Sequence, residues 1–396
     1  MESKVNVIGM GVISAIGNSV DQSITSFESH TSGISPLTLF DTVHRYLPVG
    51  EVRYSNAQLS DMLGMEKKFN RSTLLGIYAA RQAWRELNIS KKWRTGIVSG
   101  TTVGGMDITE DLFRKYKTQD PTIDYHDIRD HECGSVTERI ADDLGIRNTV
   151  ATINTACSSS VNSIIYASRL IKHGLLDVAI AGGVDALTKF TLNGFNSLMI
   201  LDKQPCRPFD ETRNGLNLGE GAGFLILVSE KVLKEESLNP LCQIAGYANT
   251  NDAFHQTASS PDGRGSYLSM EQALKISRLA TSEIDYINLH GTGTRNNDSS
   301  EGIAVQRLFK DTIPPSSSTK SFTGHTLGAS GGMEAVFSVL SIMQGCVFPN
   351  LRFTSRMTEL KFDPVVEFKR GLNINHVMSN SFGFGGSCSS IIFSKT

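Results

Sequence analysis

The sequence lacks any continuous apolar run of the roughly 20 residues that a membrane-spanning helix needs. Its first residues lack the pattern of a signal peptide, so we expect neither export nor a membrane anchor. It also lacks an excess of one charge, because 38 basic residues face 40 acidic ones, for a formal net charge of −2. This balance argues against a nucleic-acid or anionic membrane surface as the main partner. We therefore expect a soluble globular protein.

Cysteine spacing of the kind found in metal sites and disulfide frameworks is also missing. The six cysteines lie far apart, with no C-x-x-C pair and no Cys/His cluster. This distribution argues against a zinc site and fits a reducing compartment, so we expect a cytoplasmic protein without a metal.

What the sequence has is an alternation of short apolar strands and helical segments, which is typical of an α/β protein with a largely buried sheet. The predicted strands are 5–8, 95–99, 150–154, 178–181, 224–228, 242–247, 286–289 and 389–393. The predicted helices are 74–86, 136–144, the segment after residue 157, 267–279, 299–309 and 328–343. Because the later elements repeat the order of the earlier ones, we predict two similar halves, residues 1–238 and 239–396.

Cys157 stands where a predicted strand stops and a helix begins. The helix is indicated by Val161, Ile164, Ile165 and Ile171, which recur at helical spacing. The N-terminus of a helix favours a thiolate, so Cys157 is a candidate nucleophile. The alternative, that it is a small buried apolar residue like most free cysteines, remains open on local sequence.

The second half supplies histidines beside turns. His290 ends an apolar strand and precedes the small turn Gly-Thr-Gly-Thr294, so its imidazole should face open space. Lys320 and His325 flank a glycine-rich turn before the helix that carries Glu334, and this spacing suits a cation–imidazole pair. A hydrogen-bonded turn histidine and a solvated lysine are the alternatives.

A glycine-rich run near the C-terminus embeds two aromatic residues, Phe382 and Phe384. Glycines on either side allow a backbone N–H to approach a ligand closely, so this run is a candidate source of an oxyanion donor. Packing of the two rings in the core is the alternative.

Together these runs resemble the β-ketoacyl-ACP synthases, decarboxylating condensing enzymes of the thiolase superfamily. The matching runs are Asn154-Thr-Ala-Cys157, Arg207-Pro-Phe-Asp210, Leu218-Gly-Glu-Gly-Ala-Gly223, His290-Gly-Thr-Gly-Thr294, Lys320-Ser-Phe-Thr-Gly-His325 and Asn380-Ser-Phe-Gly-Phe-Gly-Gly386. They span essentially the whole chain. The resemblance implies two βαβαβαββ halves packed as a layered α-β-α-β-α sandwich, usually paired as a homodimer.

The resemblance also implies a reaction: an acyl group held on Cys157 condenses with malonyl-ACP to give 3-oxoacyl-ACP and carbon dioxide. Backbone N–H groups of Cys157 and Phe384 would hold the oxyanion. His290 and His325 would bind the malonyl thioester as neutral imidazoles, and Lys320 would orient His325. No cofactor is expected, because both substrates are carried on the phosphopantetheine of an acyl carrier protein.

Further roles follow from the same resemblance. Asp298, Glu301 and Glu334 would be carboxylates that balance Lys320, and Phe384 would be a gate between acyl chain and malonyl site. The positions expected along the substrate path are Thr257, Thr292, Thr294, Phe382, Val103 and Phe195. For His255 a structural role is at least as good an interpretation.

Two departures from the family pattern affect the substrate. Ser387-Cys388 replaces the usual Thr-Asn, which could remove a hydrogen bond that supports the gate loop. Thr102 would add bulk and a hydroxyl to the acyl pocket. The pathway is therefore open between fatty acid synthesis and a specialised polyene, pigment or polyketide route.

An acidic carrier protein needs local positive charge for docking, and Lys67, Lys68 and Arg71 form the best candidate cluster. Two other functions remain possible. The chain could be a non-catalytic or chain-length-shaping partner in a ketosynthase heterodimer, although such partners generally lack the nucleophile. It could also be a thiolase-type acyltransferase, for which Cys388 is the only candidate second cysteine.

Overall fold

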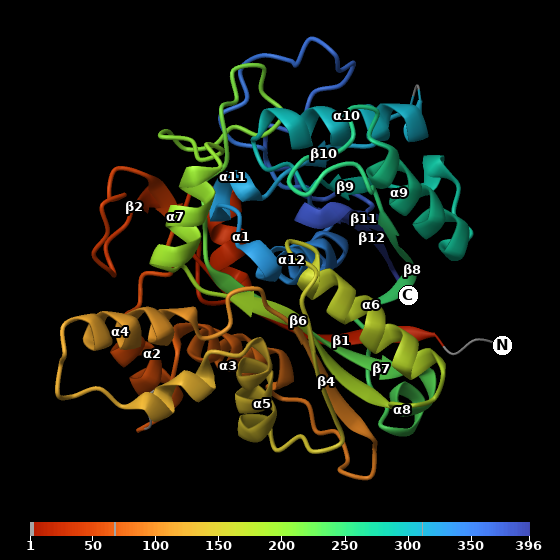
Figure 1. Ribbon diagram of the computed structural model, residues 1–396. Coiled ribbons are helices and arrows are strands. Elements are labelled where there is room, and N and C mark those ends of the chain that lie inside the picture. The colour runs from red at the N-terminus through yellow and green to blue at the C-terminus, as the bar shows by residue number, and fades with distance from the viewer. Residues whose placement is uncertain (1–3, 67–68, 311) are drawn as a thin grey trace.

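The strands of the computed structural model, which describes residues 4–66, 69–310 and 312–396, form one large sheet beside a small two-stranded one (Figure 1). The large sheet has ten strands in the order β10-β9-β11-β12-β8-β1-β7-β6-β4-β5. At its centre, β1 and β8 pair through only two residue pairs, Asn6 with Gln243 and Val7 with Cys242. The sheet therefore consists of two five-stranded parts joined by a short seam.

The observed bounds extend most of the predicted elements. The first part has β1 (Val5–Ser14), α3 (Arg71–Trp84), β4 (Thr95–Gly100), α5 (Cys133–Leu144), β5 (Thr149–Ile153), α6 (Ser159–Lys172), β6 (Val178–Asp185) and β7 (Gly221–Ser229). The second part has β8 (Cys242–Asn251), α9 (Arg264–Ser277), β9 (Tyr286–Asn288), α10 (Arg295–Phe309), β10 (Ser316–Ser317), α12 (Ser330–Gln344), β11 (His376–Phe382) and β12 (Ser387–Ser394).

The two parts have the same topology. Counted outward from the seam, the strands run β1-β7-β6-β4-β5 in one part and β8-β12-β11-β9-β10 in the other. In both, the two pairings nearest the seam are antiparallel and the two outer pairings are parallel. Each part thus reads βαβαβαββ, which confirms the predicted α/β fold of two similar halves. The predicted boundary after residue 238 falls between α8 (Glu230–Glu235) and β8.

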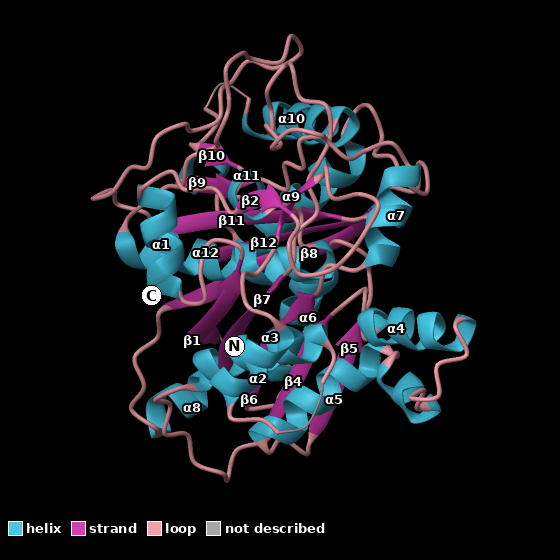
Figure 2. Ribbon diagram, turned by 90° about the vertical axis from the view of Figure 1, so that its left-hand side faces the viewer, coloured by secondary structure: helices cyan, strands magenta, loops and turns pink. Residues whose placement is uncertain are grey.

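The helices complete five layers. α6 and α12 contact each other and both parts of the sheet, so they form the middle layer. α3 and α5 cover the outer face of the first part, and α9 and α10 cover that of the second (Figure 2). In this layer α12 is enclosed on all sides, because every residue from 330 to 342 is buried. A helix that is buried all round needs apolar and small residues on every face, which its sequence provides.

Glycines let α12 approach its neighbours closely. A Cβ atom built on Gly332 would lie 2.6 Å from the carbonyl oxygen of Gly223 in β7, and one on Gly331 would lie 2.9 Å from Cβ of Val161 in α6. A side chain at either position would clash, so the Gly331-Gly332 pair is required by packing in the middle layer.

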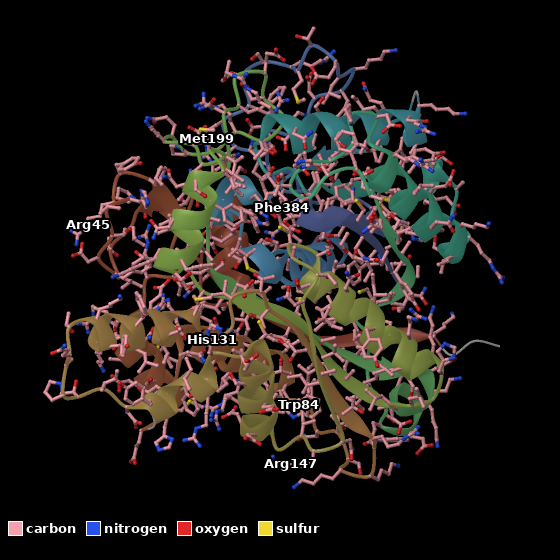
Figure 3. The ribbon with its side chains drawn as sticks, in the orientation of Figure 1. Arg45, Trp84, His131, Arg147, Met199 and Phe384 are labelled. Carbon is pink, nitrogen blue, oxygen red and sulfur yellow. The ribbon has the colours of Figure 1, made fainter. Side chains whose placement is uncertain are left out.

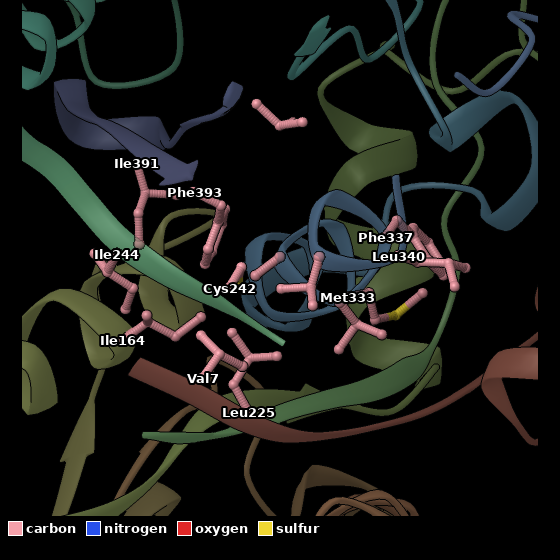
Figure 4. Close-up of a cluster of buried hydrophobic side chains, with 14 of the residues drawn as sticks. Val7, Ile164, Leu225, Cys242, Ile244, Met333, Phe337, Leu340, Ile391 and Phe393 are labelled. Carbon is pink, nitrogen blue, oxygen red and sulfur yellow. The ribbon is translucent and has the colours of Figure 1, made fainter. Parts of the chain in front are cut away.

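The central hydrophobic cluster joins the two halves (Figure 4). It includes Val7 and Ile164 from the first half and Phe337 and Phe393 from the second, all buried. Cys242 lies in the same cluster as a small apolar residue, the ordinary state of a free cysteine.

Several elements escaped prediction from the sequence. No strand was predicted at 376–382, and its residues 379–382 were interpreted as the start of a glycine-rich run, but the segment forms the buried strand β11 between β9 and β12. Its polar residues Ser379, Asn380 and Ser381 hid the strand pattern. Excursions between strands form α1 (Val20–Glu28), β2 (Ile34–Pro36), β3 (Pro48–Gly50), α2 (Asn56–Leu63), α4 (Met106–Lys117), α7 (Lys189–Ser197) and α11 (Lys320–Thr323). The charged segment 231–236, for which no helix was predicted, lies mostly in the short helix α8.

Candidate active site

The nucleophile turn lies between β5 and α6. Ala156 adopts φ +53°, a left-handed conformation that is unfavourable for a residue with a Cβ atom. Cys157 follows it at the N-terminal end of α6 and is only 6% exposed. The sharp turn directs the thiol toward the second half of the molecule rather than toward solvent.

His325 contacts the thiol directly. Its Nε2 lies 3.1 Å from Sγ of Cys157, and its Nδ1 lies 2.9 Å from the hydroxyl of Ser330, the first residue of α12. The first half fixes the backbone of His325, whose N–H donates to the carbonyl of Asn217 at 2.7 Å and whose carbonyl accepts from Gly219 at 2.9 Å. A nucleophile and a base are thus within hydrogen-bond reach across the two halves.

His290 is held by Lys320, which was expected to orient His325 instead. The ammonium of Lys320 donates to the carbonyl oxygen of His290 at 2.6 Å, lies 3.2 Å from its Nδ1, and forms an ion pair with Glu334. Because an ammonium only donates, Nδ1 of His290 must accept, and the ring proton sits on Nε2. The two imidazoles meet edge to face, with ring centroids 5.3 Å apart.

Burial and the Lys320 charge lower the pKa of His290 and of His325 well below the usual value, so both are neutral, as predicted. Burial also raises the pKa of Cys157 to about 11, although N–H groups of Phe384 and Cys157 itself and the charge of Lys320 oppose it. The backbone N–H at the start of α6 favours the thiolate, as expected, but burial outweighs it, so the resting thiol is protonated. A base must take the proton, and His325 is in place to do so.

The carboxylates of Asp298, Glu301 and Glu334 were all expected to balance Lys320, but the structure gives them different partners. Only Glu334 contacts Lys320, and burial raises its pKa to about 7. Glu301 accepts from the backbone N–H groups of His290 and Gly291, both at 2.8 Å. Asp298 accepts from those of Thr292 and Gly293 and from Phe209. Glu301 and Asp298 therefore hold the loop that carries His290 in shape.

The glycine-rich loop approaches the nucleophile from the other side. A Cβ atom on Gly383 would lie 3.1 Å from the backbone nitrogen of Cys157, so a larger residue would push the loop away. Gly385 and Gly386 have φ of +81° and +85°, which glycine adopts without strain. The N–H groups of Phe384 and Cys157 both favour negative charge on Sγ. Two backbone donors thus converge where an oxyanion would form.

Two cavities meet at Cys157. The larger, about 470 Å³, reaches the surface and is lined by predicted path residues Thr257, Thr292, Thr294 and Phe382 together with both histidines. The smaller, about 230 Å³, is mainly apolar and is lined by Val103, Met106 and Phe190, among others. Cys157, Phe195 and Phe384 border both cavities.

The rings of Phe195 and Phe384 stack with centroids 5.9 Å apart, and Figure 3 labels Phe384 in the middle of the molecule. This aromatic pair borders both cavities, which is the position that the gate predicted at Phe384 requires. His255 is exposed at the larger cavity, where its Nδ1 accepts from the N–H of Thr257 at 3.1 Å.

The structure shows the contacts made at the positions that depart from the family pattern, Ser387-Cys388 and Thr102. The hydroxyl of Ser387 lies 2.9 Å from that of Ser158 and accepts from the amide of Asn249 at 3.0 Å, so the end of the gate loop is hydrogen bonded. Thr102 does not present its hydroxyl to the acyl pocket, because that hydroxyl donates to Asp185 at 2.6 Å. Burial raises the pKa of the Cys388 thiol to about 12.

Asp185 and Ser330 were missed by sequence reasoning. The buried carboxylate of Asp185 ends β6 and accepts from Thr102, from Val103 and from the N–H of Gly328, so it ties the acyl-pocket turn to the His325 loop. A carboxylate at the end of the run Val178–Val184, which holds only apolar residues and glycines, was the available signal for it. Ser330 had no signal beyond its place beside two glycines.

The predicted docking cluster is corrected in part. Arg71 is buried, and its guanidinium forms two hydrogen bonds, of 2.8 and 2.6 Å, with the carboxylate of Glu220. It is therefore a structural ion pair and not a surface charge. Lys67 and Lys68 lie outside the described residues.

Two negative findings concern the described part of the chain. Within it, no three or more His, Cys, Asp or Glu side chains are grouped so that they could hold a metal ion. None of its helices has the length and apolar character needed to span a bilayer.

The fold and the Cys-His-His geometry define a class, the thiolase-like condensing enzymes that transfer acyl groups. The domain family described as "Beta-ketoacyl synthase, N-terminal domain" matches residues 2–232, and "Beta-ketoacyl synthase, C-terminal domain" matches residues 241–354. The chain belongs to the β-ketoacyl synthase family.

Curated relatives match along almost their whole length. The 3-oxoacyl-[acyl-carrier-protein] synthase 2 of Staphylococcus aureus is 32% identical, with 99% of this chain and 98% of the relative covered. The enzyme of the same name from Coxiella burnetii is 31% identical at the same coverage.

Solved structures agree with the fold. The ishigamide ketosynthase/chain length factor superimposes with a TM-score of 0.92 at 28% identity over all of both chains. A chain from the complex of a Xenorhabdus doucetiae ketosynthase with its chain length factor gives 0.86 at 30% identity, over all of this chain and 98% of that one. The family matches and the curated relatives, which are 3-oxoacyl-[acyl-carrier-protein] synthases, favour a condensing enzyme over the non-catalytic and thiolase alternatives.

Proposed function

We propose that the chain catalyses decarboxylative condensation of an acyl group held on Cys157 with malonyl-ACP, giving 3-oxoacyl-ACP and carbon dioxide. The observation that carries this proposal is the 3.1 Å contact between Sγ of Cys157 and Nε2 of His325, at the point where two cavities meet. A nucleophile between two cavities can receive one substrate from each side.

In the first half-reaction, Cys157 attacks the carbonyl carbon of an acyl thioester. His325 takes the thiol proton at Nε2, because the pKa of about 11 leaves Cys157 protonated near neutral pH. The N–H groups of Cys157 and Phe384 hold the oxyanion while the new S–C bond forms. The carrier thiol leaves with the proton from Nε2, and the acyl chain lies in the smaller, apolar cavity.

In the second half-reaction, the bond to the malonyl carboxylate breaks and carbon dioxide leaves. Its electrons pass to the thioester oxygen as an enolate, which accepts hydrogen bonds from Nε2–H of His290 and of His325. The enolate carbon attacks the acyl thioester on Cys157, and the Cys157 thiolate leaves. It takes up one proton, which balances the overall reaction.

The polar lining of the larger cavity supports a phosphopantetheine path from an acyl carrier protein. Hydroxyls of Thr292 and Thr294 lie 2.9 Å apart on its wall, where they can bind the amides of that arm. The names of the curated relatives contain the acyl carrier protein, which favours the same partner here.

We also propose that the protein works as a dimer in the cytoplasm. The sequence predicted a homodimer. Two structural neighbours are named together with a chain length factor, which supports a heterodimer equally well, and native mass spectrometry distinguishes the two. Six cysteines without a disulfide support a reducing compartment.

Intact-protein mass spectrometry with a panel of acyl-ACPs tests the main proposal. Wild-type protein should gain one acyl group and release it as 3-oxoacyl-ACP when malonyl-ACP is added. Cys157→Ala should gain none and form no product. Cys388→Ala, the matched control at another buried thiol that borders the larger cavity, should keep more than half of the wild-type rate.

Retained condensation through an unmodified Cys157→Ala variant would refute the proposal. Loss of activity in Cys388→Ala, with turnover that needs no malonyl group, would favour thiolase chemistry instead.

A further inference from the structure

This inference rests on the proposed function. In its two half-reactions, Nε2 of His325 must act first as an acceptor and then as a donor. In acyl transfer its Nε2 accepts the proton of Cys157, so a neutral ring must then carry its proton on Nδ1. In decarboxylation Nε2 donates to the enolate oxygen, so Nδ1 must be the unprotonated nitrogen. The partner of Nδ1 therefore has to accept in one state and donate in the other.

Ser330 is the hydrogen-bond partner that the structure places on Nδ1, at 2.9 Å. A hydroxyl can donate or accept, unlike the ammonium that fixes His290 in one tautomer. Ser330 is 2% exposed, so bulk water does not compete for this contact. The two histidines thus differ in the freedom of their tautomers, although both are buried and neutral.

A second hydroxyl allows Ser330 to turn. Its oxygen lies 3.2 Å from the hydroxyl of Thr326, which in turn donates to the sulfur of Met333 at 3.6 Å. When Nδ1–H donates to Ser330, the Ser330 proton can point to Thr326 and the Thr326 proton to Met333. When Ser330 donates to Nδ1, Thr326 can donate to Ser330. Every donor has an acceptor in both arrangements.

We propose that Ser330 is a positioning residue that supports both tautomers of His325, with Thr326 and Met333 as the reversible end of the hydroxyl chain. The exchange of tautomers adds a proton from water of the larger cavity to one ring nitrogen and returns the other ring proton to that water while the His325–Ser330 hydrogen bond opens transiently, so the charge of the site does not change.

Ser330→Ala leaves Nδ1 without a partner in both states. We expect both half-reactions to slow by roughly 10- to 100-fold, the usual consequence of an unsatisfied buried group. Rapid-quench mass spectrometry of acyl-Cys157 measures the first half-reaction. Release of labelled carbon dioxide from malonyl-ACP by pre-acylated enzyme measures the second.

Thr326→Val gives the sharper test, because it keeps the volume and removes the end of the chain. The Ser330 proton is then left with Nδ1 as its acceptor, which favours the tautomer with Nε2–H. Acyl transfer should slow about tenfold or more, while carbon dioxide release stays within about twofold of wild type. A merely structural role of either hydroxyl would not split the two rates.

Ser168→Ala is the matched control, since Ser168 is a buried serine of the neighbouring helix α6 whose hydroxyl donates to the carbonyl of Ile164 at 2.7 Å. Its rates should equal those of wild type. Ser330→Cys, which keeps a weak donor and acceptor, should give intermediate rates and replaces Ser330→Ala if thermal melting shows that variant to be unfolded.

Alkylation of Cys157 by iodoacetamide at pH 7 separates this inference from the proposed function, because it needs neither carrier protein nor malonyl group. It should slow about tenfold or more in both Ser330→Ala and Thr326→Val and remain unchanged in Ser168→Ala. Wild-type alkylation rates in both variants would overturn the inference. A wild-type enzyme that does not condense, but whose alkylation responds in this way, would overturn only the proposed function.

Discussion

Lys320 acts together with burial on the charge of the site, although it does not contact the nucleophile. It is 1% exposed and contacts His290 and Glu334. Its charge helps to lower the pKa of both histidines, while burial raises that of Glu334 to about 7. The buried cation therefore disfavours charge on two imidazoles and favours the ionised form of one carboxylate, against the burial that raises the pKa of that carboxylate.

Replacing Lys320 with methionine removes that cation while keeping a long apolar stem. The pKa of His290 and His325 should then rise, so protonation should inactivate them at higher pH than in wild type. Nδ1 of His290 also loses its donor, and carbon dioxide release should fall about 100-fold, as for one lost oxyanion donor. The rate of carbon dioxide release between pH 5 and pH 8 measures both effects.

Lys92→Met is the control, because Lys92 makes an exposed ion pair with Glu235. Such a pair contributes little, and the control should have the wild-type pH profile. If the rate of carbon dioxide release in Lys320→Met fell at the same acidic pH as in wild type, the lysine charge would not affect the pKa of the imidazoles.

At this scale the sequence predicted which residues gather but not how they pair. Cys157, His290, Lys320 and His325 each stand at the end of a strand or helix beside small residues, a local pattern that sequence shows. The nearness of Lys320 to His325 in sequence suggested a pair, yet the helix α11 (Lys320–Thr323) turns the ammonium toward His290. The high pKa of Cys157 depends on burial by both halves, which no local pattern contains.

At the scale of elements, the glycine loop between β11 and β12 is set by its distance from the nucleophile turn. Gly383 approaches both the carbonyl of Thr155 and the nitrogen of Cys157. The loop is further held by the hydrogen bond from the N–H of Gly385 to the carbonyl of Gln256, at 2.8 Å. The backbone donor of Phe384 is thus aligned by contacts on both of its sides.

Gly383→Ala should displace that donor. Its Cβ atom would lie 2.9 Å from the Thr155 carbonyl oxygen and 3.1 Å from the Cys157 nitrogen, so the loop has to move by a few tenths of an ångström. We expect acyl transfer to fall about 100-fold, because the oxyanion loses one aligned donor. Rapid-quench acylation is the measurement, with thermal melting to confirm folding.

The comparison is Gly134→Ala in α5, where a new Cβ atom meets nothing within 4 Å. Alanine in place of a helical glycine should stabilise the protein by up to about 1 kcal/mol and leave acyl transfer unchanged. Equal acylation rates in the two variants would mean that the loop is not held by this contact.

Elements with strong periodicity were predictable and the others were not. The apolar strands β6 and β7 and the helices α3 and α6 follow from burial patterns that any sheet covered on both faces requires. The strand β11 was not predictable from such a pattern. It contains polar serines and an asparagine, and its partner strand β9 lies far away in sequence. The excursion helix α1 carried a weaker signal in its cap, where Ser19 accepts from the N–H of Gln22.

For the whole molecule, the two halves are joined less by their sheet than by their shared interior. The β1–β8 seam has two residue pairs, whereas the central cluster takes buried apolar side chains from both halves. Separated halves would each expose one side of this cluster to water. The free-energy cost is about 25 cal/mol for each Å² of apolar surface exposed.

Residues 1–238 and 239–396 expressed separately should therefore show no cooperative thermal transition in circular dichroism. Mixing or co-expressing them should restore one, since the apolar faces are complementary. A single half that melts cooperatively at the wild-type temperature would contradict this expectation. The repeat that motivates the experiment was visible in the sequence, but the extent of the shared core was not.

The pairing of α6 with α12 in the middle layer has a consequence for how the protein can vary. The two helices occupy equivalent positions in the repeat, but different groups lie at their N-terminal ends. The thiol lies at the start of α6, and the imidazole with its hydroxyl chain lies at the start of α12. In a pair of identical chains, any substitution appears on both sides of such a junction. Here one substitution alters a single side, so acyl acceptance and proton handling can be adjusted separately.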